Sequence, residues 1–484
     1  MYPKRRRGLK PRRRCIHTFS MKNIPLFIAF ACLWTIACTK KTPETPIVIV
    51  PTVLKPEADP VAFAAPFTGV PATKDIALYE INMRAFSAEG NFKAVQARLD
   101  SIKALGINVL WLMPIYPVGV AKAIAPLGSP YSVKNYREVN TEFGTLSDLQ
   151  NLVKEAHNRN MAVILDWVAN HTSWDNPWIT DHPEWYTKDA AGAITIPAGT
   201  NWNDVADLNF DNAIMKTFMI SAMKYWVLKA NVDGFRCDYA DGVPAEFWRQ
   251  AIDSLAGLPN RQFIMLAEGT RNNHFWAGFN MNYGWSFYAQ LKTTFKNNGS
   301  PAGLVNAHKT EFSNVPNAAT MLRFTTNHDE SAFDDTPINL FNGRVGAMSA
   351  FVLTSFMGGV PLIYNGQEVG RTDKTPIFGR SAINWQLNPD IFDEYKRLMA
   401  FRQSSKAVKE GTLTTFDDAN LVVFKKTLAS EDVLILVNIK NSVSNYTLDA
   451  ALKNTAWKNA LDNTAVNLAT QVSLQPYQYL ILKK

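Results

Sequence analysis

Short apolar runs alternate with amphipathic stretches along most of the chain, from residue 74 to about residue 404. The runs have the length of strands, and several are apolar at consecutive positions, which is typical of parallel strands buried on both faces. Gly284 interrupts the sixth run and makes it the weakest of the set. The expected strands cover residues 76–85, 107–113, 161–168, 232–237, 263–267, 283–287, 319–325 and 360–364.

The stretches between these runs carry apolar residues at helical spacing. Strands that alternate with helices predict an α/β fold, and eight such units fit a closed (β/α)8 TIM barrel over residues 71–405. A doubly wound open sheet is the alternative, but its usual glycine-rich turn does not follow the first strand here. The expected helices cover residues 92–105, 148–159, 213–228, 247–255, 344–356 and 394–404.

Two parts of the chain depart from the regular alternation. The loop over residues 171–212 is far longer than an ordinary strand-to-helix connection, and it carries several tryptophans. It predicts a small inserted subdomain at the mouth of the barrel. After residue 405 the pattern contains strands only, at residues 421–428, 433–439 and 477–482, so we expect a C-terminal antiparallel β-sandwich over residues 406–484.

The formal net charge of +8 comes from the N-terminus, where eight Lys or Arg lie between Lys4 and Arg14. The rest of the chain is close to neutral, which argues against a nucleic-acid-binding face on the folded part. Residues 1–20 form a basic leader that is doubtful as coding sequence, because Met21 begins an ordinary signal peptide. Translation from Met1 and from Met21 both remain open.

Residues 21–38 have the features of a bacterial lipoprotein signal peptide. The apolar run over residues 24–37 is too short to span a bilayer, and it ends in Thr35-Ile36-Ala37-Cys38, which resembles a lipobox. We therefore expect acylation of Cys38 and an exported cell-envelope lipoprotein, on the outer-membrane or periplasmic side, with membrane contact through the lipid anchor only. Residues 39–70, rich in Pro, Thr, Val and Ala, predict a flexible tether.

The four cysteines leave no pair for a disulfide in the mature chain. Cys15 and Cys32 belong to the leader region, Cys38 is the acylation site, and only Cys237 remains. The exported fold is therefore expected to be stable without a cross-link.

Acidic residues stand at the ends of four separate predicted strands: Asp166, Asp238, Glu268 and Asp329. In a barrel the strand ends converge on the face that carries the chemistry. One acid after a strand is readily explained as a helix cap, but four on one rim predict an active site. Histidines and an arginine accompany them, namely His171, Arg236 and His328.

Glycoside hydrolysis uses such a set, because it needs one ionised and one protonated carboxyl group across the scissile bond. Arg236 lies two residues before Asp238, so both side chains point to the same side of the strand. A nearby guanidinium favours the ionised carboxylate that a nucleophile requires. Glu268 would be the general acid, with its pKa raised by its surroundings.

These segments resemble the conserved regions of the α-amylase family, a clan of retaining α-glucosidases and transglucosidases. The resemblance covers the barrel from about residue 76 to residue 404. It rests on Asp166 with Asn170 and His171, on Arg236 with Asp238, on Glu268, and on His328 with Asp329. Supporting similarities lie at residues 106–114, 131–145, 207–209 and 361–368.

The resemblance implies a role for each matching residue. Asp238 would attack the anomeric carbon, Glu268 would act as acid and then base, and Asp329 would bind hydroxyls of the distorted sugar. Arg236 would orient the nucleophile, and Asp166 would organise the site. The implied substrate contacts come from Tyr131, Asp166, His171, Arg236 and His328. The substrate would be an α-1,4-linked glucan or a maltooligosaccharide.

One segment departs from the family pattern. Many members have Lys-His shortly after the nucleophile, whereas this chain reads Asp238-Tyr239-Ala240-Asp241-Gly242. The departure leaves open the leaving-group preference and a structural calcium ion, for which Asn170 and an acid of the long loop are the candidate ligands. The chemistry requires no cofactor, and no His/Cys cluster suggests a transition metal.

Three alternatives remain open at this point. A transglucosidase uses the same three acids and transfers the sugar to another sugar hydroxyl. A glucan-binding protein without turnover is disfavoured because all three acids are present. A metal-dependent hydrolase built on His171 and His328 would lose its activity on exhaustive chelation.

Overall fold

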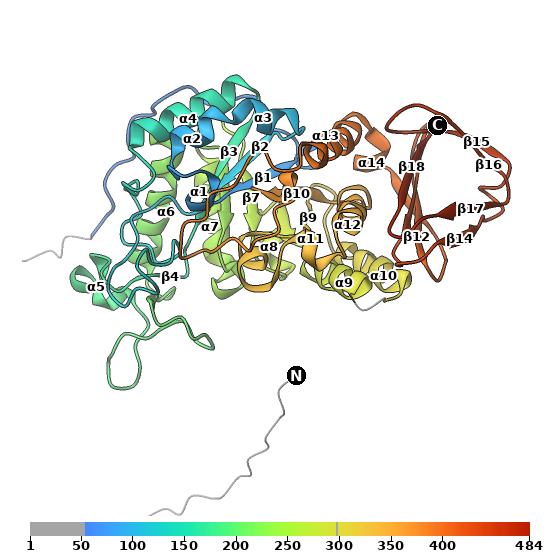
Figure 1. Cartoon of the computed structure of the whole chain (residues 1–484). Helices are drawn as coiled ribbons and strands as arrows, with labels where there is room; N and C mark the ends of the chain where they lie inside the picture. The colour runs from blue at the N-terminus through green and yellow to red at the C-terminus, as the bar shows by residue number, and fades with distance from the viewer. Residues whose placement is uncertain (1–53, 297–298) are drawn as a thin grey trace, which may run out of the picture. The chain divides into compact units, whose positions relative to one another are not determined.

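The computed structural model describes residues 54–296 and 299–484, and within them eight parallel strands close into a barrel, as predicted (Figure 1). Around the barrel the strands follow the order β1-β10-β9-β8-β7-β6-β3-β2. Their bounds are β1 (Leu78–Ile81), β2 (Val109–Leu112), β3 (Ala162–Trp167), β6 (Gly234–Cys237), β7 (Ile264–Ala267), β8 (Met281–Tyr283), β9 (Thr320–Arg323) and β10 (Val360–Tyr364).

The barrel strands are buried on both faces, which explains their continuous apolar sequence. The strands β6 and β7 approach each other closely at Gly234, where a Cβ atom would collide with the carbonyl oxygen of Ile264. Gly234 also has a φ of 149°, which an L side chain rarely adopts. The glycine thus sets the pairing of the two strands that carry Asp238 and Glu268.

Helices surround the strands (Figure 1). The predicted helix at residues 92–105 is two helices, because the chain tightens at Arg98, whose N–H donates to the carbonyl of Val95 (3.0 Å). The bounds are α1 (Met83–Phe86), α2 (Phe92–Ala97), α3 (Leu99–Ala104), α4 (Leu146–Asn158), α6 (Ala213–Lys229), α7 (Ala245–Ala256), α8 (Asn273–Ala277), α9 (Trp285–Lys296), α10 (Pro301–Phe312), α11 (Pro337–Leu340), α12 (Arg344–Phe356), α13 (Pro389–Ser404) and α14 (Lys406–Glu410).

The predicted sixth strand, residues 283–287, is wrong in its position. The strand β8 ends at Tyr283, and α9 begins at Trp285. Gly284 separates the two elements, because its N–H donates to Leu322 (3.0 Å) and a side chain there would collide with the Arg323 guanidinium. The apolar residues after it, such as Phe287 and Leu291, recur at helical spacing and form the buried face of α9.

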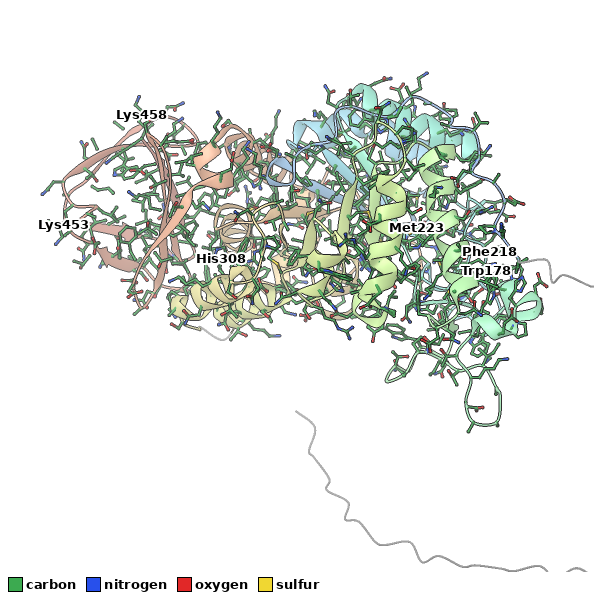
Figure 2. All side chains as sticks on the ribbon, turned by 180° about the vertical axis from the view of Figure 1, so that it is seen from behind. Trp178, Phe218, Met223, His308, Lys453 and Lys458 are labelled. Carbon is green, nitrogen blue, oxygen red and sulfur yellow. The ribbon has the colours of Figure 1, made fainter. Side chains whose placement is uncertain are left out.

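The long loop after β3 folds into a small subdomain, as predicted. Its strands β4 (His171–Ser173) and β5 (Val205–Asp207) pair antiparallel, and it contains the short helix α5 (Trp178–Asp181). Trp178 and Phe218, both labelled in Figure 2, pack on Trp185 with ring centroids 5.0 and 4.9 Å away. This aromatic packing attaches the subdomain to α6 and holds it over the end of β3.

The C-terminal part forms an antiparallel sheet in the order β11-β12-β13-β18-β15-β16 and a separate pair, β14-β17. Tyr479 joins it to the barrel, because its hydroxyl donates to Glu394 of α13 (2.8 Å). The bounds are β11 (Thr412–Phe416), β12 (Leu421–Leu428), β13 (Glu431–Asn438), β14 (Ser444–Thr447), β15 (Thr455–Asn459), β16 (Ala465–Leu468), β17 (Gln471–Leu474) and β18 (Tyr479–Lys483).

The described part of the predicted tether, residues 54–70, lies against the barrel. The ring of Phe67 stacks on His157 of α4 with centroids 4.1 Å apart, and the N–H of Phe63 donates to the carbonyl of Leu228 (2.8 Å). This segment is therefore anchored, because the ring of Phe67 and the backbone of Phe63 both find partners on the barrel surface. The predicted leader, the signal peptide and Cys38 lie outside the described residues. Among the described residues, no helix is both long and apolar enough to cross a membrane.

Candidate active site

Arg236, on β6, lies at the centre of three carboxylates. Its Nη1 donates to Oδ1 of Asp166 and to Oδ1 of Asp238, both at 2.9 Å. Its Nη2 lies 2.9 Å from Oε1 of Glu268, in an ion pair without hydrogen-bond alignment. Its Nε donates to the hydroxyl of Tyr283 (3.2 Å). Because Arg236 is completely buried, these carboxylates compensate its charge and fix one another in space.

His328 and Asp329 follow the end of β9 and complete the set. The Nε2 of His328 lies 2.7 Å from the hydroxyl of Tyr131 and 3.5 Å from Oδ2 of Asp329, and its Nδ1 lies 2.5 Å from Oε1 of Glu80. The hydroxyl of Tyr131 is also within 3.2 Å of Oδ2 of Asp166. One hydrogen-bonded chain therefore connects the strand ends of the barrel.

Glu80 is a residue that the sequence reasoning missed. It is the only acid in β1 (Leu78–Ile81), and its side chain is completely buried against His328. A single carboxylate in an otherwise apolar strand was the available signal, because a buried acid needs a partner. Trp111 of β2 was also missed, although its Nε1 donates to Asp166 (3.1 Å).

The acids face a cavity of about 550 Å³ at the C-terminal ends of the strands. Asp238, Glu268 and Asp329 line it directly, whereas Asp166 and Arg236 are completely buried beneath them. The other lining residues are Ile124, Ser129, Tyr131, His171, Asn201, Trp202, Asp204, Val205, Tyr239, Asp241, Gly269, Trp285, His328, Phe333, Ile377 and Phe378. The mixture of aromatic faces and converging polar groups suits a ligand with hydroxyl groups and flat apolar faces.

Burial raises the pKa of Glu268 to about 7 and that of Asp238 to about 6, although Arg236 lowers both. The other carboxylates of the site raise the two pKa values further. The guanidinium therefore favours ionisation of Asp238, as the sequence suggested, but burial outweighs it. Glu268 loses its proton at a higher pH than Asp238 does. Between the two pKa values there is therefore a pH range in which Asp238 is charged and Glu268 is neutral.

His328 is held as a cation. Burial would lower its pKa, but the carboxylates of Asp329 and Glu80 outweigh burial and raise the pKa to about 9. The Tyr131 ring lies 5.3 Å away at an interplanar angle of 23°, so the aromatic face is stacked on the imidazolium. At neutral pH the site thus carries two fixed cations, Arg236 and His328, among its acids.

His171 behaves in the opposite way. Burial lowers its pKa to about 4, so its imidazole is neutral at physiological pH. Its ring lies 5.5 Å from that of Trp202, and the side-chain nitrogen of Asn170 lies 3.3 Å from its Nδ1. Asn170 itself is buried and does not line the cavity. Within residues 54–296 and 299–484, no group of three or more His, Cys, Asp or Glu side chains is arranged to hold a metal ion.

The segment after Asp238 adds cavity residues that the sequence did not assign. Tyr239 has a φ of 41°, and this left-handed turn aims its N–H at Oε2 of Glu268 (2.8 Å). The carboxylate of Asp241 accepts from the N–H of Thr270 (3.1 Å) and lies 3.4 Å from Nε2 of His274. The turn therefore positions Glu268 through the backbone.

All the site residues predicted on the barrel and its long loop come together, with Asn170 behind His171 instead of at the cavity. The catalytic domain of the α-amylase family matches residues 63–192 and 199–458. The chain is 29% identical over 325 residues to an α-amylase of Haloarcula japonica, covering 64% of this chain and 46% of that protein. It is 26% identical over 389 residues to an α-amylase of Dictyoglomus thermophilum, covering 75% of this chain and 66% of that protein.

The chain therefore spans about half and about two thirds of the length of these two relatives. Among solved structures, an α-amylase from Lactobacillus plantarum superposes with a TM-score of 0.77 at 28% identity, covering 85% of this chain and 99% of that one. The family match extends over most of the described residues, and it includes every strand end that carries an acid of the site. This chain belongs to the α-amylase family.

Proposed function

We propose that the protein is a retaining glycosidase that cleaves α-glucosidic bonds, α-1,4 bonds above all, in starch-derived glucans or maltooligosaccharides. The observation that carries the proposal is the shared contact of Asp238 and Glu268 with one buried guanidinium, at the floor of the cavity. Carboxyl groups that share one guanidinium lie close together. This favours the roughly 5 Å separation of retaining enzymes over the larger spacing of inverting ones.

In the first step, a carboxylate oxygen of Asp238 attacks the anomeric carbon while Glu268 gives its proton to the glycosidic oxygen. The bond from the anomeric carbon to that oxygen breaks, and the leaving sugar departs with a new hydroxyl group. In the second step, the Glu268 carboxylate removes a proton from water, and the water oxygen attacks the anomeric carbon. The ester bond to Asp238 breaks, and both acids return to their starting states.

Other residues would hold the sugar through this change. Asp329 lines the cavity with a side chain 40% exposed, so its carboxylate is free to bind sugar hydroxyls. His328 would donate a hydrogen bond to the same sugar, and Tyr131 presents its ring to the cavity. Asp166, which is completely buried, would act by fixing Arg236 and Tyr131.

A product profile tests the proposal. The purified protein is incubated with soluble starch, maltoheptaose and pullulan, and the anomeric form of the first products is followed by NMR. Shorter α-maltooligosaccharides are expected, since two inversions at the anomeric carbon retain its configuration. Initial β-products would contradict the mechanism, and products longer than the substrate would assign the alternative, transfer to a sugar hydroxyl.

Calcium at Asn170 stays a prediction from the resemblance. Asp207 pairs with His171 in the β4–β5 ladder, and burial raises the pKa of its carboxyl group. Asn170 and Asp207 supply fewer oxygen donors than the six to eight that calcium takes, so no step is assigned to a metal. A lower melting temperature after chelation with EDTA would support a structural ion.

We further propose that the chain is exported and anchored to the cell envelope through acylated Cys38. The proposal rests on the signal-peptide pattern of residues 21–38. Metabolic labelling with palmitate in a bacterial host is expected to mark the protein, and the C38A variant is expected to lose the label and leave the membrane fraction. Equal labelling of both proteins would refute the anchor.

A further inference from the structure

Four arginine side chains are buried almost completely in the described part of the chain, and they differ in how their charge is compensated. Arg84 and Arg323 each form an ion pair with a glutamate, and Arg236 contacts three carboxylates of the active site. Arg402, on α13, forms no ion pair with any residue that the structure describes. A buried charge is costly unless an opposite charge or hydrogen bonds compensate it, so Arg402 needs a partner.

Carbonyl oxygens compensate only part of the charge of Arg402. Its Nε donates to Ser355 (3.1 Å), its Nη1 to Ile76 (3.4 Å) and its Nη2 to Gly359 (2.9 Å). A guanidinium has five N–H groups, so two of them have no acceptor among the described residues. Ser355 belongs to the last turn of α12, and a helix end carries only a fraction of a negative charge. Burial lowers the pKa of Arg402 to about 10, and the charge of Asp75 opposes this only in part.

Lys426, on β12, brings a second buried cation to the same place. Only 6% of this residue is exposed, and it shares the strand face of Val422 and Phe424, which pack into the core of the barrel. Its Nζ makes no hydrogen bond or ion pair within residues 54–296 and 299–484. Burial and the charge of Arg402 lower the pKa of Lys426 to about 8, so the two cations are close enough to repel each other.

The neutral groups nearby do not supply the missing negative charge. The hydroxyl of Ser355 is buried and has no partner among the described residues. His308 of α10, labelled in Figure 2, has its Nδ1 3.4 Å from Nη2 of Arg323, so Nδ1 accepts and Nε2 carries the hydrogen. Burial, together with the charges of Arg323 and Lys426, lowers the pKa of His308 to about 2 and keeps the ring neutral. The group that would satisfy Arg402 and Lys426 is therefore an acceptor with a negative charge.

We propose that Arg402 and Lys426 form a binding site for a small inorganic anion, chloride in size and charge, between the barrel and the C-terminal sheet. The ion would accept from the remaining N–H groups of Arg402, from the ammonium of Lys426 and from the hydroxyl of Ser355. A monatomic ion suits two side chains that are 1% and 6% exposed. Because α13 belongs to the barrel and β12 to the sheet, the bound ion would hold the two together.

The site is separate from the active site. Ile76 precedes β1 and Gly359 precedes β10, so Arg402 contacts the N-terminal ends of the strands, whereas the acids lie at their C-terminal ends. The proposal therefore does not depend on the glycosidase function. Glycosidase activity and anion binding can each fail without the other.

Thermal unfolding in two sodium salts tests the proposal. The melting temperature of the native protein is expected to be about 3 °C higher in about 0.1 M chloride than in gluconate at the same concentration, as for an ion at roughly ten times its dissociation constant. Gluconate matches the ionic strength but is too large for a buried site. K426M keeps the length of the side chain without its charge and is expected to abolish the difference. K425M is the matched control, because Lys425 pairs with Asp432 (3.3 Å) on the other face of β12, and it is expected to keep the difference.

Equal melting temperatures of the native protein in the two salts would refute the site. A chloride effect of the same size in K426M would also refute it, because the ion would then act elsewhere. Diffraction from crystals grown in sodium bromide decides the question even if K426M does not fold. An anomalous bromine peak is expected in contact with Nζ of Lys426 and the guanidinium of Arg402, and a native crystal without that peak would overturn the proposal.

Discussion

Replacing Glu80 by Gln removes one of the two carboxylates that hold His328 as a cation. Glu80 and His328 are both completely or nearly completely buried, and their side chains are 2.5 Å apart. Gln has the same shape and keeps a carbonyl oxygen as acceptor, so the change removes the charge and preserves the packing. The variant therefore isolates the electrostatic contribution of Glu80.

The direction and size of the effect follow from the opposing influences on His328. Burial is the largest single influence on the pKa of His328 and lowers it more than the charge of Asp329 raises it, so the charge and the hydrogen bond of Glu80 are needed to bring the pKa to about 9. With Asp329 alone, burial prevails and the pKa falls to 6.5 or below. This fall corresponds to a loss of roughly 3 kcal/mol in the stabilisation of the imidazolium. His328 in E80Q is then neutral at pH 7.5.

The assay is a 13C-edited NMR titration of histidine ring protons between pH 5 and 10, with the His328 resonance assigned by its loss in H328Q. In the native protein the resonance is expected to move near pH 9, and in E80Q at pH 6.5 or below. Because a raised pKa in the folded state stabilises the fold at low pH, the native protein is also expected to lose this contribution between pH 6.5 and 9. E80Q is expected to lack that decline.

E368Q is the matched control. Glu368 is as buried as Glu80, but its carboxylate accepts from the hydroxyl of Tyr79 and from the N–H of Gly366. The control is expected to leave the titration of His328 near pH 9. A His328 pKa that stays near 9 in E80Q would refute the reasoning, because Glu80 would then contribute nothing to the charge of the imidazole.

Three further predictions concern the acids and the N-terminal segment. E268Q is expected to lower kcat on maltoheptaose about 10²- to 10⁴-fold, as loss of a general acid does. The first release of nitrophenol from p-nitrophenyl substrates, seen as a burst, is expected to be spared because that leaving group needs less protonation, and the missing base then slows turnover; loss of the burst as well would contradict the assignment. The pH profile of kcat/KM is expected to fall below about pH 6, where Asp238 gains a proton, and above about pH 7, where Glu268 loses its own; a flat profile over pH 5–9 would contradict it. F67A removes a half-buried ring stacked on His157, so it is expected to lower the free energy of unfolding by about 1–3 kcal/mol in urea denaturation. Its activity is expected to be unchanged. An unchanged stability would mean that residues 54–70 are not anchored.

The barrel could be predicted from the sequence because its strands are apolar throughout and each ends at a recognisable residue. The prediction for residues 360–364 coincides with β10, and Asp238 and Glu268 fall directly after β6 and β7. The sixth strand was misplaced because Trp285 and Phe287 alternate with polar residues over too short a distance to separate a strand from the first turn of a helix.

The partners of the site residues could not be predicted, because they come from distant parts of the chain. Glu80 reaches His328 across 248 positions of sequence, because β1 pairs with β10 and β10 pairs in turn with β9. Lys426 carries no motif of its own, and only the packing of β12 against the barrel shows that it is buried near Arg402. Residues 54–70 have the composition of a tether, and composition does not report that Phe67 meets His157.

The measurement that tests the central claim most directly is the identification of the residue that becomes covalently bound to the sugar. The E268Q variant is incubated with 5-fluoro-α-glucosyl fluoride, whose good leaving group allows the first step while the missing base slows the second. Peptide mapping by mass spectrometry is expected to find the fluoroglucosyl group on Asp238 and on no other residue. A stable adduct on a different residue, or turnover of the reagent by D238N at the rate of the native protein, would contradict the account.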